Sequence, residues 1–309
     1  MTDKQRYQKL FRQALLIRLV EEKIIELYPF DKIQSPVHLS IGQEAVAVGV
    51  CESLHQEDLV FITYRGHAFY LAKGGDLKQM MAELYGRANG VSKGKAGSMH
   101  LAAPEVGVMG ASAVVASTIS LAVGAALANR LQNKQGLSVV CFGDGATEQG
   151  TYHESLNFAA LYSLPVLFLC ENNGLAVHTT LAERQTYAIH KHAQAYGIES
   201  VRIEEGWDFQ KIGDVTASIT AAMRKDGRPR LIEVITCRYK EHVGPGEDYD
   251  AGYRSRTDID DWMARDPLCL DTELATKMLP ELDAEINAAV AFAEAGPLPG
   301  PQDLLTDIV

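Results

Sequence analysis

The 309-residue sequence lacks the features of several protein classes. No apolar run approaches the ~18 residues of a membrane span, and the opening MTDKQRYQKL does not have the pattern of a signal or transit peptide. Basic residues are fewer than acidic ones, with 29 Lys and Arg against 40 Asp and Glu, which argues against nucleic acid as a partner. We therefore expect a soluble, cytoplasmic protein that binds neither membranes nor nucleic acid.

Cysteine is scarce, and no CxxC pair occurs among the five cysteines. Cys141, Cys170 and Cys237 fall in strand-like runs, so we expect buried thiols in a reducing compartment rather than disulfides. A P-loop is also missing. The glycine- and lysine-rich residues 86–100 have Ala96 at the position where a P-loop Ser or Thr would bind Mg²⁺.

The centre of the chain predicts a strand, a helix and a second, parallel strand. Residues 139–142 are a short apolar run that stops at Gly143-Asp144-Gly145, and residues 165–170 are a second run that stops at Glu171-Asn172-Asn173. Residues 151–162 between them have apolar positions at helical spacing. Both polar clusters should therefore lie at the carboxyl edge of a parallel sheet, where open sheets bind ligands.

The residue types at this edge suit a cation and a phosphate. An Asp carboxylate and an Asn carbonyl are oxygen ligands of the kind that Mg²⁺ prefers and often shares with phosphates. Helix amino ends attract diphosphate, and the flanking glycines allow close approach of the backbone. The sequence thus predicts a Mg²⁺-diphosphate site that includes Asp144 and Asn173.

The remaining patterns predict an α/β fold with helical extensions at both ends. We expect an N-terminal helical arm over residues 1–35, an α/β domain over 36–255 and a C-terminal helical extension over 256–309. An alanine-rich helix within residues 107–128 is apolar on nearly all sides, so we expect it to be buried. The other expected elements are helices at 5–28, 76–85, 208–224, 258–264 and 271–295, and strands at 58–64, 199–203 and 230–238.

Several motifs resemble one family. GDGATEQG at 143–150, followed by ENN at 171–173, resembles the alpha subunit of the thiamine-diphosphate-dependent first component of 2-oxo acid dehydrogenases, which includes the pyruvate, branched-chain and acetoin enzymes. Residues 38–45, 64–67, 86–100, 107–118 and 231–242 resemble further motifs of the family in the same order. The resemblance implies the parallel-sheet thiamine-diphosphate-binding fold, with thiamine diphosphate and Mg²⁺ as cofactors.

The resemblance also implies roles for individual residues. Tyr64 and Arg65 correspond to residues that hold the cofactor diphosphate, beside Gly145 and Ala146, and the metal ligands correspond to Asp144, Asn173 and the backbone carbonyl of Leu175. Ala113, through its backbone, and Val115 correspond to contacts of the aminopyrimidine end, although Ala113 and Ala116 replace family glycines. His242 and His38 correspond to the acid/base and intermediate-stabilising groups, and a histidine suits this work because its ordinary pKa is ~6.5.

The family completes its site with a second chain. The resemblance implies a beta subunit that supplies the pyrimidine-binding domain and a catalytic Glu, in an α₂β₂ assembly. The loop 240–252 departs from the family pattern, with Lys240 and Glu241 in place of His and Gly and with acidic Glu247, Asp248 and Asp250. Three hypotheses stay open: a dehydrogenase component that passes an acyl group to a lipoyl acyltransferase, a biosynthetic acyl or aldehyde transferase without a lipoyl partner, and a catalytically idle binding subunit.

Overall fold

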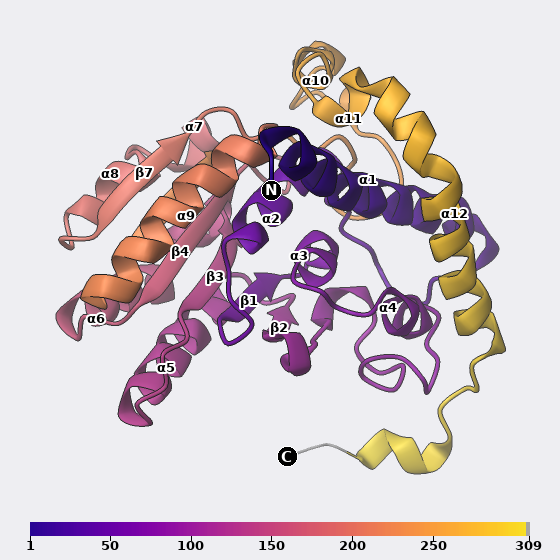
Figure 1. Ribbon diagram of the computed structural model, residues 1–309, viewed down its shortest axis with the longest axis horizontal. Helices are drawn as coiled ribbons and strands as arrows, with labels where there is room; N and C mark the ends of the chain where they lie inside the picture. Colours follow the sequence, from indigo (N-terminus) through magenta and orange to yellow (C-terminus); the bar gives the residue numbers. More distant parts are fainter. Residues whose placement is uncertain (307–309) are drawn as a thin grey trace.

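A computed structural model, which describes residues 1–306, has one six-stranded parallel sheet at its centre (Figure 1). From edge to edge the strands are β2 (Val108–Ser112), β1 (Leu59–Thr63), β3 (Ser138–Gly143), β4 (Val166–Asn172), β8 (Arg230–Ile235) and β7 (Glu199–Ile203). β3 and β4 pair in parallel from Ser138 opposite Val166 to Gly143 opposite Glu171. The α/β fold and the central strand–helix–strand unit, with α6 at Gly150–Leu161, are confirmed.

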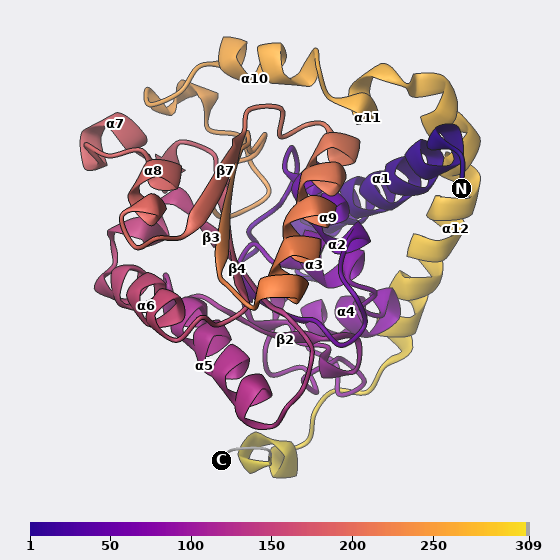
Figure 2. The same cartoon turned by 60° about the vertical axis from the view of Figure 1, so that its left-hand side comes forward.

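Helices cover both faces of this sheet (Figure 2). Successive strand residues point to opposite faces, so Val139 and Cys141 pack in one apolar cluster while Val140 and Phe142 pack in another. The first cluster contains residues of α1 (Asp3–Leu27), α2 (Glu44–Glu52), α3 (His67–Ala72), α4 (Leu77–Leu84) and α9 (Phe209–Asp226). The second contains residues of α5 (Ser117–Leu131), α6 and α8 (Ile189–Gln194). Both faces of the sheet are therefore buried, as expected for a parallel sheet.

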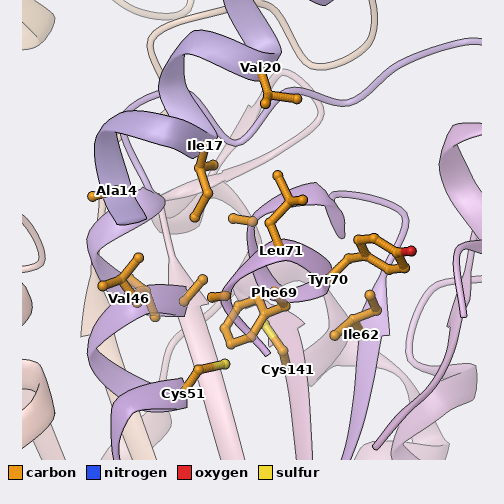
Figure 3. Packing of buried hydrophobic residues seen from close by; sticks show 14 of the residues in the cluster. Ala14, Ile17, Val20, Val46, Cys51, Ile62, Phe69, Tyr70, Leu71 and Cys141 are labelled. Atoms are coloured by element: carbon orange, nitrogen blue, oxygen red, sulfur yellow. The ribbon is translucent and has the colours of Figure 1, made fainter. Parts of the chain in front are cut away.

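The N-terminal helix α1 is part of the core. A capping box at Thr2 starts the helix, and the 3-10 turn Tyr28–Phe30 that contains Pro29 follows its end. Figure 3 shows Ile17 of α1, Val46 of α2 and Phe69 of α3 pointing into the cluster that also holds Cys141 of β3. The predicted helix at 5–28 is confirmed, and it supports the elements that lead into the carboxyl edge of the sheet.

The C-terminal helices close the structure along α1 and α4 (Figure 1). α12 (Thr272–Ala295) packs against both of these helices, and α10 (Arg256–Met263) and α11 (Pro267–Leu270) precede it. Arg18 of α1 forms ion pairs with Glu44 of α2 and with Asp266, which caps α11. The helices predicted for the C-terminal segment are thus present, although residues 307–309 of that segment lie outside the described residues.

Two expectations about elements are wrong. The alanine-rich helix α5 is not buried on all sides, because Ile119, Ala122 and Ala126 face the sheet while Leu121 and Leu131 are exposed. The sequence stretch before it contains an unpredicted strand, β2. The last strand, β8, ends at Ile235 rather than at Arg238, and the chain after it turns into the loop that carries His242.

Two expectations from the sequence concern disulfides and membrane-spanning segments. All five cysteines are free thiols, with Cys51, Cys141 and Cys170 buried and Cys237 and Cys269 partly buried. Within residues 1–306, no helix combines the length and the apolar character that a bilayer crossing needs.

Candidate active site at the carboxyl edge of the sheet

A cavity of about 260 Å³ lies where β1, β2, β3 and β4 end. It is bordered by the turn after β3, the turn after β4, the start of α5 and the loop that carries His242. Nine of the residues singled out in the sequence line it: Tyr64, Arg65, Val115, Asp144, Gly145, Ala146, Asn173, Leu175 and His242. Residues from five separate stretches of the chain therefore meet in one place, as the parallel topology predicted.

His38 and Ala113 are not among the residues that line the cavity. The His38 ring lies directly behind the lining, with its centre 4.4 Å from that of Tyr64 and 5.1 Å from that of His242. Ala113 is exposed beside the cavity, next to the lining residues Ser112, Val114 and Val115. The structure thus groups His38 with the site, whereas a role for Ala113 depends on its backbone.

Both histidines are neutral at neutral pH. Burial, together with the nearby positive charge of Arg65, lowers the pKa of His38 to about 3 and that of His242 to about 4. His38 Nδ1 is also buried without a hydrogen-bond partner among the described residues. A buried polar atom without a partner is rare, so this nitrogen calls for a partner that residues 1–306 do not supply.

Arg65 is a buried guanidinium without a carboxylate partner in residues 1–306. Its Nη1 donates to the carbonyl of Leu39 and its Nη2 donates to the carbonyl of His242 at 3.2 Å. Burial lowers its pKa, and the charges of Glu21 and Glu171 oppose that shift only in part. A buried cation that lines a cavity in this way fits a bound phosphate.

Asp144 is buried in the 3-10 turn that follows β3 (Asp144–Glu148). Its carboxylate pairs with Arg184, which also pairs with Glu148, and the Gln185 side chain donates to the Asp144 carbonyl at 3.1 Å. Burial raises the pKa of Asp144, and the Arg184 guanidinium opposes that rise. The sequence reasoning missed Arg184 and Gln185, because they follow the short hairpin of β5 (Leu175–Ala176) and β6 (Thr179–Thr180) without a periodic pattern.

The turn after β4 brings Asn173 and Leu175 to the cavity. Asn173 Nδ2 donates to Gln43 Oε1 at 2.9 Å, and Asn173 Oδ1 accepts from the backbone N–H of Leu175 at 3.1 Å. Gln43 precedes α2 and also lines the cavity, as does Glu171, which accepts a hydrogen bond from the Cys141 thiol at 3.0 Å. Gln43 is a site residue that sequence reasoning left unassigned, although it lies in the IGQEA segment.

This donor set fits a Mg²⁺ ion shared with a diphosphate. Asp144, Asn173 and Leu175 all line one cavity, where a carboxylate, an amide and a backbone carbonyl would be oxygen donors to a cation, and Arg65 supplies a positive charge. No group of three or more His, Cys, Asp or Glu side chains suited to a metal ion occurs in residues 1–306. Mg²⁺ keeps several water or phosphate ligands and needs only a few protein oxygens, so a small set is sufficient.

The loop 240–252 is held from inside by one of its acidic residues. Asp248 is buried and pairs with Arg238 at 2.9 Å and with Arg254. Arg254 Nη2 also donates to the Lys240 carbonyl at 2.9 Å, and Glu241 accepts from the N–H of Gly246 at 2.7 Å. Asp248 therefore closes the loop that presents His242, whereas Glu247 and Asp250 are exposed.

Comparison with known proteins identifies the family of this chain. The family model described as the dehydrogenase E1 component matches residues 12–302. The chain is 37% identical to the alpha subunit of acetoin:2,6-dichlorophenolindophenol oxidoreductase from Bacillus subtilis, over 97% of this chain and 92% of the relative. It is 36% identical to the pyruvate dehydrogenase E1 component subunit alpha of Zymomonas mobilis, over 99% of this chain and 89% of the relative. On these similarities, this chain belongs to the dehydrogenase E1 component family.

Proposed function

We propose that this chain is the alpha subunit of a heteromeric oxidoreductase that depends on thiamine diphosphate and Mg²⁺. Its substrate would be a 2-oxo acid or an acetoin-type compound, which the enzyme decarboxylates or cleaves. The observation that carries the proposal is the convergence of the buried Arg65 with Asp144, Asn173 and Leu175 on one cavity. The alpha subunits of acetoin- and pyruvate-oxidising enzymes among its relatives support it.

The residues of the chain divide the work of holding the cofactor. Arg65 and Tyr64 would bind the diphosphate, while Asp144, Asn173 and the Leu175 carbonyl would hold Mg²⁺. Val115 would contact the aminopyrimidine end, and Ala113 would do so through its backbone. Bound thiamine diphosphate would supply a nucleophile for the substrate carbonyl and an electron sink for the bond cleavage.

His242 and His38 would handle protons at the substrate. Because their pKa values are about 4 and about 3, each can accept a proton or a hydrogen bond at neutral pH. The ring of Tyr64 packs against both, with its centre 4.4 Å from that of His38 and 5.7 Å from that of His242. The unpartnered Nδ1 of His38 supports a role at the site rather than a structural role.

The proposal includes a partner. We infer a beta subunit that supplies the pyrimidine-binding domain and a catalytic Glu, in an α₂β₂ assembly. The described residues support this, since beyond the six-stranded sheet they form only the two-stranded sheet of β5 and β6. A cytoplasmic location stays a prediction.

Calorimetry tests the cofactor. The chain is reconstituted with its beta subunit and titrated with thiamine diphosphate, with and without Mg²⁺. We expect Mg²⁺-dependent binding that Asp144→Ala weakens at least about tenfold, whereas Asp250→Ala on the exposed loop binds as the unmodified chain does. Binding that is indifferent to Mg²⁺ and to Asp144 would contradict the proposal.

A second experiment identifies the acceptor. The exposed Glu247 and Asp250 lie on the loop that carries His242, and they motivate the alternative of a biosynthetic acyl or aldehyde transferase without a lipoyl partner. Reductive acylation of a lipoyl domain by the reconstituted enzyme supports the hypothesis that the chain is a dehydrogenase component. Carbonyl cleavage without lipoyl acylation supports the transferase, and absence of both supports an idle binding subunit.

A further inference from the structure

Glu233 of β8 is a buried carboxylate next to the turn after β4, but it does not line the cavity. Its Oε1 accepts a hydrogen bond from Asn172 Nδ2 at 2.7 Å. Its Oε2 accepts from the backbone N–H of His190 at 3.1 Å and lies 2.9 Å from His190 Nδ1. Both carboxylate oxygens therefore act as acceptors, and both are used by other parts of the chain.

These contacts determine which way the Asn172 amide points. Because its nitrogen donates to Glu233, its Oδ1 is turned to the backbone N–H of Gly174, from which it accepts at 3.0 Å. Asn173 makes contacts of the same kind one residue later. Its Nδ2 donates to Gln43 Oε1, and its Oδ1 accepts from the backbone N–H of Leu175. Two overlapping side-chain-to-backbone turns thus set the path of residues 172–175.

We propose that Glu233 is a positioning residue for the cation, because it fixes the Asn172 amide and so the turn that presents Asn173 Oδ1 and the Leu175 carbonyl. This inference rests on the proposed function. Mg²⁺ demands near-octahedral oxygens at about 2.0–2.1 Å, so a small displacement of this turn weakens its binding.

A carboxylate is required at this position for a geometric reason. A glutamine has one acceptor oxygen and one donor nitrogen. The backbone N–H of His190 cannot turn away, so the single oxygen serves it. The glutamine nitrogen then faces the nitrogen of Asn172, and Asn172 must rotate its amide. Its own N–H groups then face the N–H of Gly174, and the turn opens. Glu233→Gln therefore replaces one hydrogen-bond acceptor by a donor, while the size and shape of the side chain stay the same.

A second substitution, at Asn172, should restore the hydrogen-bond pattern that Glu233→Gln disrupts. In the double variant Asn172→Asp with Glu233→Gln, the new amide donates to the new carboxylate and still accepts from His190. The second oxygen of that carboxylate accepts from Gly174, as Asn172 Oδ1 does in the native chain. The double variant has the same net charge as the native chain, because one carboxylate is lost and one is gained.

The test measures thiamine diphosphate binding by calorimetry at a series of Mg²⁺ and Ca²⁺ concentrations, with the chain reconstituted with its beta subunit. We expect Glu233→Gln to raise the half-saturating Mg²⁺ concentration about tenfold, which is the typical effect of losing a residue that hydrogen-bonds to and orients the metal ligands. The double variant should return this concentration to the native value. Ca²⁺ accepts longer and less regular ligand distances, so its half-saturation should rise less. Glu199→Gln, on the exposed side of β7, is the matched control.

The two proposals fail in different ways. If the native enzyme does not bind thiamine diphosphate with Mg²⁺, the proposed function is wrong. If it does, and Glu233→Gln leaves both half-saturations unchanged or raises them equally, only the role of Glu233 is overturned. Should Glu233→Gln fail to fold, the double variant decides, because a folded double variant with weak Mg²⁺ binding also overturns it.

Discussion

Ala116 begins α5 with a backbone that suits glycine. Its φ is 64°, it is buried, and it lines the cavity. The left-handed conformation costs an L-residue roughly 1–2 kcal/mol because Cβ approaches the following carbonyl. The family resemblance matches Ala116 to a glycine, and the φ of Ala116 lies in the left-handed region that glycine adopts without this cost.

We therefore expect Ala116→Gly to raise the free energy of unfolding by about 1 kcal/mol. Ala128→Gly, within α5, serves as the control and should lower it by about 1 kcal/mol, because there glycine only adds freedom to the unfolded chain. Guanidinium unfolding of both variants measures the effect. Changes of the same sign would show that Ala116 is not strained.

His38 should make the fold sensitive to acid. Below pH ~6.5 the unfolded chain takes up a proton at His38 that the folded chain, with a pKa of about 3, does not. The free energy of unfolding therefore falls as the pH decreases from ~6.5 towards 3, by at most about 1.4 kcal/mol per pH unit from this residue.

Urea unfolding at pH 7, 6 and 5 measures this slope. His38→Gln should lose less free energy of unfolding between pH 6 and 5 than the native chain does. His55→Gln, at an exposed histidine, should keep the native slope. An unchanged slope in His38→Gln would mean that His38 titrates normally in the folded chain.

At the scale of elements, the glycine-rich loop 86–97 is wrapped around one carboxylate. Glu83 of α4 is buried, and it accepts from the backbone N–H groups of Ser92 and Gly94 at 2.8 and 2.9 Å. Its other oxygen accepts from Ala96 and Gly97 at 2.7 and 3.1 Å. The amides that could have formed a phosphate-binding loop are occupied by an anion of the protein itself, which agrees with the missing P-loop motif.

Glu83→Gln should open this loop. An amide keeps one acceptor oxygen and turns N–H groups towards two backbone N–H groups, each of which costs roughly 1–3 kcal/mol when buried and unpaired. We expect the free energy of opening at those four amides to fall by about 2–4 kcal/mol, measured by hydrogen exchange. Glu105→Gln, at an exposed residue, is the control. Native protection in Glu83→Gln would show that the carboxylate does not hold the loop.

The elements that the sequence predicted well are those with local signals. The apolar runs of β3 and β4 and the polar residues that stop them placed Asp144 and Asn173 at one edge of the sheet. The contacts that orient these two residues come from far along the chain and have no local signal: Arg184 for Asp144 and Gln43 for Asn173. The left-handed backbone of Val177 was equally unpredictable, because the Arg238 guanidinium, 3.0 Å from its carbonyl, holds it.

At the scale of the whole molecule, the exposed face of α5 bears on how the chain assembles with a partner. α5 and α6 lie side by side on one side of the sheet (Figure 2), and both helices expose large apolar side chains. They are Leu121, Leu131, Phe158 and Leu161, and the exposed Val114 and Val115 extend the patch to the cavity, which they line. An apolar patch that reaches the mouth of a site marks an interaction surface. If the cofactor lies between subunits, the proposed beta subunit covers this face.

The division of the chain into an N-terminal arm, an α/β domain and a C-terminal extension, with boundaries at residues 35 and 255, stays a prediction.

Leu121→Glu tests that assignment. Leu121 is 58% exposed, so the substitution should leave the free energy of unfolding of the chain within about 0.5 kcal/mol. At an interface, the same change would remove an apolar contact and bury a charge, and we expect it to weaken assembly with the beta subunit at least about tenfold. Sedimentation velocity of the mixed subunits measures this. Leu270→Glu, at a 63% exposed leucine of α11 on the opposite side of the molecule (Figure 1), should assemble normally. Equal assembly of both variants would place the beta subunit elsewhere.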